Sequence, residues 1–284
     1  MSETTEPFET VPGSGPTRDG ADGSWAGATS PSRVDAAASR PSDPPSAAPN
    51  DSRVQAQLMD PSTEHHLMVR RTARFHTLGA PSGPLQQVWF VCHGYGQLAG
   101  RFIRHFRTIA SDSRLIVAPE ALNRYYTDSE PGPHGPQSRV GATWMTREDR
   151  LAEIDDYVTY LDALYAHIFE VVDRDAVEVY ALGFSQGAAT VSRWVAFGEA
   201  RIDQLVLWGS FLPADLDLDE AAPRLHTVRP ILVAGEQDEF ASPEMAERDA
   251  DRMRELGLDA QVITFPGGHT LVRSILGQIA QKEI

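Results

Sequence analysis

Residues 177–198 read VEVYALGFSQGAATVSRWVAFG, and this stretch decides the fold. Residues 177–183 are mostly apolar, which predicts a buried strand, and residues 186–198 carry apolar side chains at helical spacing. Between them lies GFSQG (183–187), an instance of the pattern G-x-S-x-G. Glycines two positions either side of the serine allow a sharp strand-to-helix turn that lifts the hydroxyl clear of the sheet. The stretch therefore predicts Ser185 as a nucleophile.

Both flanks of this stretch alternate short apolar segments with helical patterns. Strands that are apolar along most of their length indicate a parallel sheet that is covered on both faces. We therefore predict an α/β fold, with a doubly wound, mostly parallel sheet, helices on both faces and no large cap domain. The expected strands cover residues 66–76, 86–92, 115–119, 177–183, 204–210, 230–236 and 261–267, and the expected helices cover 98–110, 146–172, 186–198, 243–256 and 270–282.

Two segments interrupt the alternation. Residues 1–64 are acidic, rich in Pro, Ser and Ala, and poor in large apolar residues, so we predict a disordered tail ahead of a catalytic domain at 65–284. Residues 119–143 contain many prolines and glycines and are predicted to form a loop. This loop starts where a parallel strand ends, at the edge of the sheet that binds ligands in such folds. We therefore expect it to set substrate preference.

An acid and a base follow later strands. Asp238 stands directly after the strand 230–236, and His269 directly after the strand 261–267. The order Ser185, Asp238, His269 is that of the α/β-hydrolases, in which the imidazole takes the serine proton and the carboxylate orients the imidazole. Other acids remain open as alternatives to Asp238: Glu236, Glu239 and the run DLDLDE (215–220), which we interpret as a solvated loop.

A glycine-rich turn, CHGYGQ (92–97), follows the strand 86–92. Such a turn can present a backbone N–H to an oxyanion. We expect Tyr95 to supply one donor, with Gly96 as the next choice, and Gln186 to supply the other because it directly follows the nucleophile. His93 is expected to form structural hydrogen bonds rather than to act as a base.

Several segments together resemble the phospholipase/carboxylesterase family, a branch of the α/β-hydrolases that includes acyl-protein thioesterases. They are HGYG (93–96), ATW (142–144), GFSQG (183–187), GSFLP (209–213), GEQD (235–238) and GGH (267–269). The resemblance covers about residues 86–284. It implies a compact esterase fold, hydrolysis of esters or thioesters without a metal, and frequent dimerisation. Residues 119–143 depart from the family's usual loop.

The sequence thus predicts a serine carboxylesterase that cleaves carboxylic esters through an acyl-enzyme. The alternatives are an acyl-thioesterase or lysophospholipase on the same triad, and a non-catalytic binding protein on a hydrolase fold. An intact Ser, Asp and His set argues against the last of these. The acyl pocket is expected to include Leu98, Trp144, Met145, Phe211 and Leu212, although packing in the core explains each of them equally well.

Composition limits the partners. The net charge of −15 disfavours nucleic acid, and the sequence has no apolar run long enough for a transmembrane helix. The N-terminal residues lack the apolar region of a signal peptide, so we expect a cytoplasmic protein. The expected partner is a small-molecule ester or thioester, with no cofactor and no metal. A homodimer is the assembly that the family resemblance suggests.

Overall fold

The computed structural model describes residues 63–128 and 133–283. It divides the chain into two units, residues 1–67 and 68–284. Within the first unit only residues 63–67 are described, and they form neither helix nor strand. The predicted tail, residues 1–64, therefore lies almost wholly outside the described residues, and its disorder stays a prediction.

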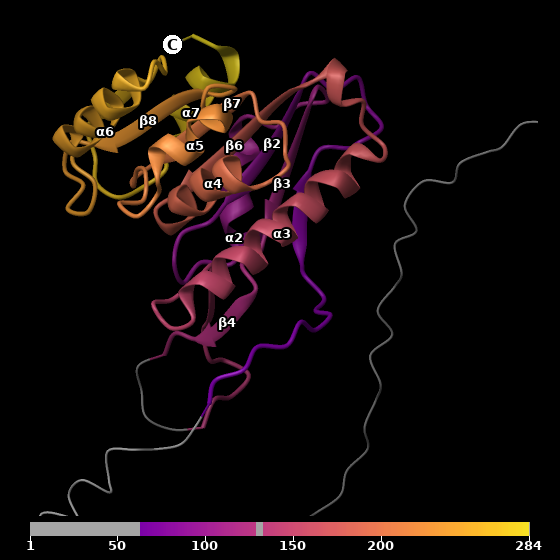
Figure 1. The fold of residues 1–284 in the computed structure, drawn as a ribbon. Coiled ribbons are helices and arrows are strands. Elements are labelled where there is room, and N and C mark those ends of the chain that lie inside the picture. The colour runs from indigo at the N-terminus through magenta and orange to yellow at the C-terminus, as the bar shows by residue number, and fades with distance from the viewer. Residues whose placement is uncertain (1–62, 129–132, 284) are drawn as a thin grey trace, which may run out of the picture. The chain divides into compact units, whose positions relative to one another are not determined.

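Seven strands form the central sheet, in the order β1-β3-β2-β6-β7-β8-β9 (Figure 1). The strand β1 is antiparallel to β3, and the other neighbouring pairs are parallel. The prediction of a doubly wound, mostly parallel sheet is therefore confirmed. The strands are β1 (Phe75–Leu78), β2 (Gln87–Cys92), β3 (Arg114–Pro119), β6 (Glu178–Phe184), β7 (Gln204–Trp208), β8 (Arg229–Gly235) and β9 (Gln261–Phe265).

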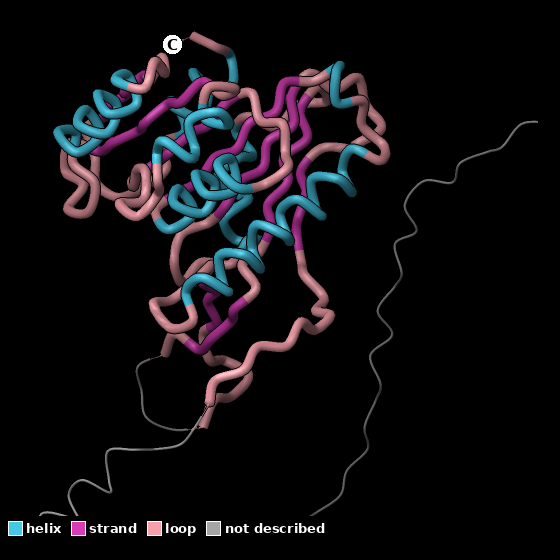
Figure 2. Tube along the Cα trace, in the orientation of Figure 1, coloured by secondary structure: helices cyan, strands magenta, loops and turns pink. Residues whose placement is uncertain are grey.

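Helices cover both faces of this sheet (Figure 2). They are α2 (Ala99–Phe102), α3 (Arg150–Phe169), α4 (Gln186–Phe197), α5 (Leu218–Leu225), α6 (Pro243–Glu255) and α7 (Arg273–Gln281), with short 3₁₀ helices η1 (Ile103–Thr108) and η2 (Arg174–Ala176). Among the described residues, no helix is both long and apolar enough to cross a bilayer.

Alternate residues of β2 belong to two separate hydrophobic clusters. Phe90 packs with Trp194 of α4, in the cluster that also holds residues of α3, α5 and α6. Trp89 belongs to the cluster that holds residues of α2, η1 and α7. Successive side chains of a strand point to opposite faces, so a strand buried on both faces must be apolar at nearly every position. This explains the continuous run QVWFVC in β2.

Four local predictions are wrong. The strand expected at 66–76 forms only at its end, because residues 66–74 are in neither helix nor strand and β1 covers Phe75–Leu78. Residues 119–143 do not form a plain loop, because β4 (Asn123–Tyr126) and β5 (Val140–Thr143) pair as an antiparallel hairpin. The helix expected at 98–110 is a four-residue α2 followed by η1. The run DLDLDE is not all loop, since Asp217 caps α5 by accepting hydrogen bonds from two backbone amides. A cap of this kind is a local signal for a helix start.

The strand order changes direction beside β2. Its neighbour on one side is β3, the next strand along the chain, and its neighbour on the other side is β6. Ligands bind at such switch points, outside the carboxyl ends of the strands. The register pairs Cys92 with Gly183, so the turn after β2 and the turn after β6 leave the sheet side by side.

Candidate active site

The turn after β6 is very tight. Ser185 alone separates β6 from α4, and it has φ 55° and ψ −121°, a conformation that is strained for any residue with a side chain. A Cβ on Gly183 would lie 2.1 Å from the carbonyl oxygen of Gly187, and a Cβ on Gly187 would lie 2.2 Å from the carbonyl oxygen of Cys92. Only glycine fits at these two positions. The turn therefore presents Ser185 at the N-terminus of α4.

The predicted acid and base are in direct contact. Nδ1 of His269 lies 2.7 Å from Oδ2 of Asp238, whose side chain is 1% exposed. The other carboxylate oxygen, Oδ1, accepts hydrogen bonds from the backbone N–H groups of Phe240 (2.9 Å) and Ala241 (3.1 Å). Because the carboxylate accepts a hydrogen bond from Nδ1–H, the neutral form of the imidazole has its lone pair on Nε2. Such an imidazole can act as a general base through Nε2.

Residues at the ends of β6 and β7 surround the imidazole. The ring of Phe184, which directly precedes Ser185, lies 4.8 Å from the His269 ring. A Cβ on Gly209, after β7, would lie 2.9 Å from Cε1 of His269. The indole N–H of Trp208 donates to the carbonyl oxygen of Thr270 at 2.9 Å and holds the loop that carries His269. The predicted serine, acid and base thus gather at one edge of the sheet.

Hydrogen bonds in the turn after β2 leave one amide free. The N–H of Gly94 donates to Oε1 of Gln97 at 2.9 Å, that of Gly96 to the carbonyl oxygen of Ala142 at 2.9 Å, and that of Gln97 to the carbonyl oxygen of Gly94 at 3.2 Å. The N–H of Tyr95 has no acceptor in the part of the chain that the structure describes. This pattern favours Tyr95 over Gly96 as an oxyanion donor.

A second free amide lies next to the serine. Gln186 is the first residue of α4, and the first N–H groups of a helix have no partner within the helix. A Cβ on Gly94 would lie 3.2 Å from Cβ of Ser185, so the turn that carries Tyr95 borders the serine. Two free N–H groups near one nucleophile form the arrangement that stabilises an oxyanion in acyl transfer.

His93 is fully buried behind this turn. Its Nε2 accepts a hydrogen bond from the N–H of Ala121 at 3.1 Å, so Nδ1 carries the proton and donates to the carbonyl oxygen of Gly94 at 2.8 Å. Burial lowers the pKa of His93, and this effect exceeds the opposing effects of the Gly94 bond and of the charge on Glu120. A neutral imidazole with both nitrogens occupied has the structural role that the sequence indicated.

The side chain of Gln186 has a role that the sequence did not reveal. Its Oε1 accepts from the N–H of Trp144 at 3.0 Å, and its Nε2 donates to the carbonyl oxygen of Met145 at 2.8 Å. Gln186 also exchanges hydrogen bonds with the hydroxyl of Thr143. The residue that follows Ser185 thus fixes residues 143–145 beside the site. The glutamine in GFSQG was the feature of the sequence that could have indicated this role.

The predicted pocket residues differ in burial. Trp144 is 1% exposed and donates its indole N–H to the carbonyl oxygen of His93, which places it in the core. Phe211 and Leu212 are buried as well, whereas Leu98 and Met145 are partly buried. Leu98 and Met145 are therefore the better candidates for substrate contact.

A set of ion pairs that the sequence missed joins one loop to two helices near these residues. Arg193 of α4 is 3% exposed and donates to Asp215 at 2.8 Å, and Arg150 at the start of α3 donates to the same carboxylate. Burial raises the pKa of Asp215, but the two arginines outweigh burial and the net pKa lies below the usual value. Asp215 therefore connects the loop after β7 to α3 and α4.

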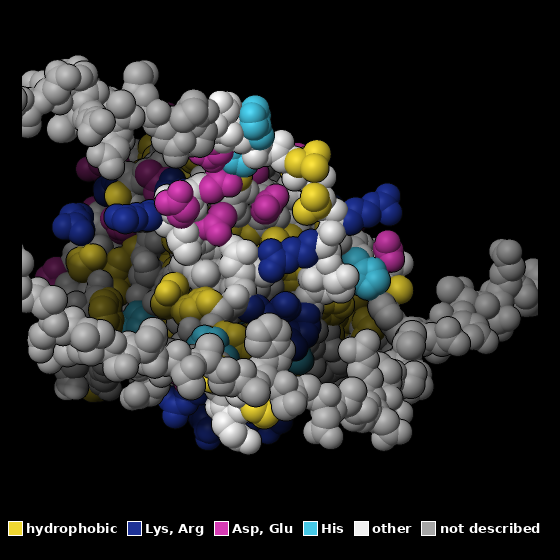
Figure 3. All heavy atoms as spheres, turned by 90° about the horizontal axis from the view of Figure 1, so that it is seen from below, with side chains coloured by type: hydrophobic (Ala, Val, Ile, Leu, Met, Phe, Trp, Pro, Cys, Tyr) yellow, Lys and Arg dark blue, Asp and Glu magenta, His cyan; other side chains and the backbone are white. Residues whose placement is uncertain are grey.

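Two aromatic rings at the site are exposed. Phe240 is 72% exposed and lies 5.1 Å from the His269 ring, and Tyr95 is 61% exposed. Viewed from below, the molecule shows hydrophobic side chains among basic and acidic ones (Figure 3). Large apolar side chains beside a reacting group are surfaces that an apolar substrate can cover.

A family model described as Serine hydrolase (FSH1) matches residues 83–273, a span that contains all of these groups. The chain belongs to this family. The matched span of this serine hydrolase includes the strand-to-helix turn at Ser185 as well as Asp238 and His269. A comparison with curated protein sequences gives no match.

Solved structures similar to this serine hydrolase include several esterases. The esterase PE8 is 22% identical, with a TM-score of 0.54 over 75% of this chain and 98% of that chain. A carboxylesterase from Mesorhizobium loti is 17% identical, with a TM-score of 0.57 over 74% and 94%. The acyl-protein thioesterase 2 of Zea mays is 17% identical, with a TM-score of 0.53 over 75% and 98%. At these identities the likeness establishes the α/β-hydrolase fold.

Proposed function

We propose that this serine hydrolase cleaves carboxylic esters through an acyl-enzyme on Ser185, with His269 as general base and Asp238 as the orienting acid. The observation that carries the proposal is the 2.7 Å contact between Nδ1 of His269 and the buried Asp238. A serine hydroxyl is a poor nucleophile near neutral pH, and an oriented imidazole removes this limit. The names of the similar esterase structures are consistent with the proposal.

Acylation begins when Oγ of Ser185 attacks the ester carbonyl and Nε2 of His269 takes the hydroxyl proton. The carbonyl oxygen becomes an oxyanion, which accepts hydrogen bonds from the N–H groups of Tyr95 and Gln186. Each such donor contributes about 2.7–4 kcal/mol to transition-state stabilisation in comparable sites. Collapse of the tetrahedral intermediate breaks the bond to the alcohol oxygen, which leaves with the proton from His269.

Deacylation repeats these steps with water. His269 removes a proton from the water, and the resulting oxygen nucleophile attacks the acyl carbon. The bond to Ser185 Oγ then breaks, and the serine recovers its proton from His269. Ester and water are consumed, and acid and alcohol are formed, so the enzyme returns to its starting protonation state.

The experiment is active-site labelling with a fluorophosphonate probe, together with hydrolysis of 4-nitrophenyl butyrate. We expect the probe to modify Ser185, as located by mass spectrometry of the labelled peptide. Ser185→Ala should abolish labelling and leave less than about 1% of the esterase activity, because loss of a triad serine usually costs far more than a hundredfold. Ser274→Ala, an exposed serine in α7, is the matched control and should label and hydrolyse like the wild type.

Labelling elsewhere than Ser185, or full activity of Ser185→Ala, would overturn the assignment. Absence of both labelling and hydrolysis in the wild type would favour a binding protein on a hydrolase fold. The thioesterase and lysophospholipase alternatives use the same triad. Parallel assays with an acyl thioester and a lysophospholipid separate them from the esterase by their relative kcat/KM.

The cellular setting is also part of this proposal. We propose that the enzyme acts in the cytoplasm on a small-molecule ester and that two copies pair, as the family resemblance implies. The net charge of −15 supports the further expectation that nucleic acid is not a partner. Sedimentation velocity of the purified chain measures the assembly directly.

A further inference from the structure

The β4–β5 hairpin is attached to the turn that carries the free amide of Tyr95. The N–H of Gly96 donates to the carbonyl oxygen of Ala142 at 2.9 Å, and the N–H of Ala142 donates to the carbonyl oxygen of Gln97 at 3.2 Å. A Cβ on Gly141 would lie 2.5 Å from the carbonyl oxygen of Gly96. The backbone of β5 therefore contacts this turn directly, and residues of the hairpin are held at a fixed position beside it.

Within the hairpin, Tyr125 stands opposite Gly141. Side chains of opposed residues lie on the same face of an antiparallel pair, and a glycine leaves that space to its partner. The Tyr125 hydroxyl accordingly reaches the turn, where a Cβ on Gly96 would lie 3.3 Å from the phenolic oxygen. The Tyr125 ring packs against the Tyr95 ring with centroids 5.4 Å apart. Tyr125 thus places a polar atom one residue beyond the proposed oxyanion donor.

That polar atom is buried and has no hydrogen-bond partner among the described residues. Burial raises the pKa of Tyr125, and the Tyr95 hydroxyl, which lies close by without forming a hydrogen bond of normal geometry, raises it further. The hydroxyl therefore remains protonated and can donate a hydrogen bond. Buried polar groups are nearly always hydrogen-bonded, so a donor whose one neighbouring hydroxyl is poorly placed to accept is suited to a partner from outside the chain.

We propose that the Tyr125 hydroxyl is a specificity-determining group that donates a hydrogen bond to an oxygen atom of the substrate close to the scissile ester. The inference rests on the proposed function of Ser185. It names the substrate class: esters with an ether or hydroxyl oxygen within two or three bonds of the reacting carbonyl, in preference to plain alkyl esters. A site with a fixed donor selects the ligand that carries an acceptor, because the analogue without one leaves the donor unpaired.

Two pairs of matched substrates test this inference. On the acyl side, 4-nitrophenyl methoxyacetate and 4-nitrophenyl butyrate have chains of the same length that differ by one oxygen. On the alcohol side, 2-methoxyethyl butyrate and n-butyl butyrate differ in the same way. The quantity measured is the ratio of kcat/KM for the oxygen-bearing ester to that for the alkyl ester, in the wild type and in Tyr125→Phe. The ratio cancels differences in active enzyme concentration, and comparison between variants cancels the intrinsic reactivity of the esters.

We expect Tyr125→Phe to lower this ratio about tenfold in one of the two pairs, the effect of one hydrogen bond between uncharged groups. The pair that responds identifies the side of the ester that Tyr125 contacts. Melting temperature should not fall, because the phenyl ring keeps the packing and the unpartnered hydroxyl is removed. Tyr126→Phe is the matched control: the next residue of β4 is 48% exposed and stacks on His134 with centroids 3.8 Å apart, and its ratio should stay at the wild-type value.

An unchanged ratio in both pairs would overturn the inference, and so would an equal change in Tyr126→Phe. If the wild type is labelled at Ser185 and hydrolyses all four esters while Tyr125→Phe keeps both ratios, this inference fails and the esterase proposal stands. If the wild type is neither labelled nor active, the esterase proposal fails, and this inference fails with it because it depends on that proposal.

Discussion

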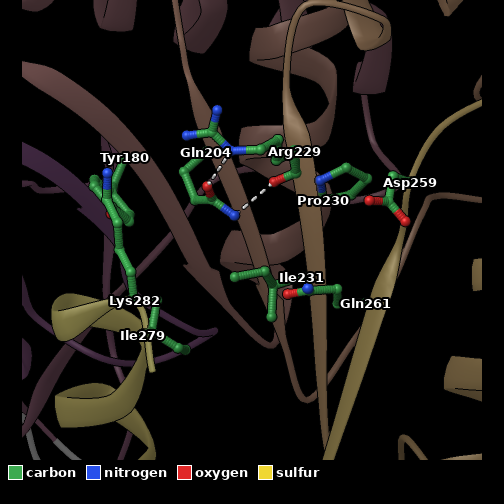
Figure 4. Close-up of a pocket in the computed structure, with 9 residues that line it drawn as sticks. All are labelled: Tyr180, Gln204, Arg229, Pro230, Ile231, Asp259, Gln261, Ile279 and Lys282. Atoms are coloured by element: carbon green, nitrogen blue, oxygen red, sulfur yellow. Dashed lines mark hydrogen bonds between the residues drawn. The ribbon is translucent and has the colours of Figure 1, made fainter. Parts of the chain in front are cut away.

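The two edges of the central sheet use their polar groups differently. At the amino edge, a cavity of about 260 Å³ is lined by residues that begin β7, β8 and β9 (Figure 4). Two of its polar residues bond each other: Nε2 of Gln204 donates to the carbonyl oxygen of Arg229 at 3.0 Å, and Nε of Arg229 donates to Oε1 of Gln204 at 3.1 Å. Glu178 nearby accepts from Tyr180 at 2.8 Å and pairs with Lys282 at 2.9 Å.

At the carboxyl edge, by contrast, three donors are left without acceptors in the described chain: the N–H of Tyr95, the N–H of Gln186 and the hydroxyl of Tyr125. Donors and acceptors that satisfy one another, as those of Gln204 and Arg229 do, have little to offer a ligand. A surface with fixed, unpaired donors can bind and polarise one. Unpaired hydrogen-bonding capacity therefore distinguishes the reactive edge better than the presence of a cavity does.

The largest expected effect at the carboxyl edge comes from Asp238→Asn. The asparagine carbonyl can still accept from the amides of Phe240 and Ala241, so the loop should keep its shape. Its NH₂ group then faces Nδ1 of His269, which would have to become an acceptor, and the proton would move to Nε2. An imidazole protonated at Nε2 cannot take the serine proton. We expect kcat to fall about 10³–10⁴-fold in the ester assay, as for triads with this change.

Glu239→Gln is the control for this prediction, because Glu239 is an exposed acid adjacent to Asp238 and was an alternative choice for the triad. It should leave kcat within about twofold of the wild type. Loss of activity in Glu239→Gln, or more than about a tenth of the activity in Asp238→Asn, would show that the acid is wrongly assigned.

The sequence predicted the strand ends that carry Ser185, Asp238 and His269 because their signals are local. Each follows an apolar strand, and topology alone then brings the carboxyl ends of parallel strands to one edge. GFSQG adds a steric signal, since the glycines at 183 and 187 are positions where a Cβ would meet backbone. Local patterns of this kind are sufficient to propose Ser185, Asp238 and His269 as nucleophile, acid and base.

The β4–β5 hairpin was missed because its stabilising contacts are distant in sequence. Proline and glycine in residues 119–143 indicate a loop, but Ala142 bonds to the turn at 96–97, more than forty residues earlier. The unpaired state of the Tyr125 hydroxyl and the partners of the Gln186 side chain are likewise consequences of tertiary packing. No periodicity in one segment reports which donors another segment will satisfy.

A smaller effect is expected on stability at low pH, and it should come from three ionisable groups beyond the carboxyl ends of β2, β3 and β7: the buried His93 and Glu120, and the more exposed Asp215. For Glu120, burial raises the pKa, but hydrogen bonds from Arg124 and Arg74 outweigh it and the net pKa is lowered. The pKa of Asp215 is lowered in the same way, by its two arginines, and the pKa of His93 is lowered by burial. All three groups bind protons more weakly in the folded chain than in the unfolded chain.

The direction in which stability changes with pH follows from this difference in proton binding. A lowered pKa gives stability that is present above the unfolded pKa and is lost as pH falls through the folded pKa. His93 should begin to destabilise the fold below about pH 6.5, its ordinary pKa, and the two carboxylates should add to this below about pH 4. Melting temperature at pH 4.5 should be lower than at pH 7.5 by about 5 °C or more. A melting temperature that rises on acidification would contradict the assignment of these shifts.

The smallest effect is expected from the amino edge, where Arg229→Gln tests whether the cavity is only structural. The substitution removes an exposed cation that pairs with Glu178, while Lys282 and Tyr180 remain in place to satisfy that carboxylate. Exposed ion pairs contribute about 0–1 kcal/mol, so the melting temperature should fall by no more than about 3 °C. The value of kcat/KM should stay within about twofold, because no group of the proposed mechanism bonds to Arg229.

Arg248→Gln, which removes an exposed arginine of α6, controls for the change in net charge. If Arg229→Gln lowered kcat/KM more than about fivefold while Arg248→Gln did not, and both kept their melting temperatures, the amino edge would be coupled to the reactive edge through the strands they share. The contrast between a satisfied cavity and an unsatisfied site would then be wrong as a guide to function. If both variants retain full activity, the polar network around Gln204 and Glu178 serves to hold the strand starts together, and the chemistry belongs to the opposite edge alone.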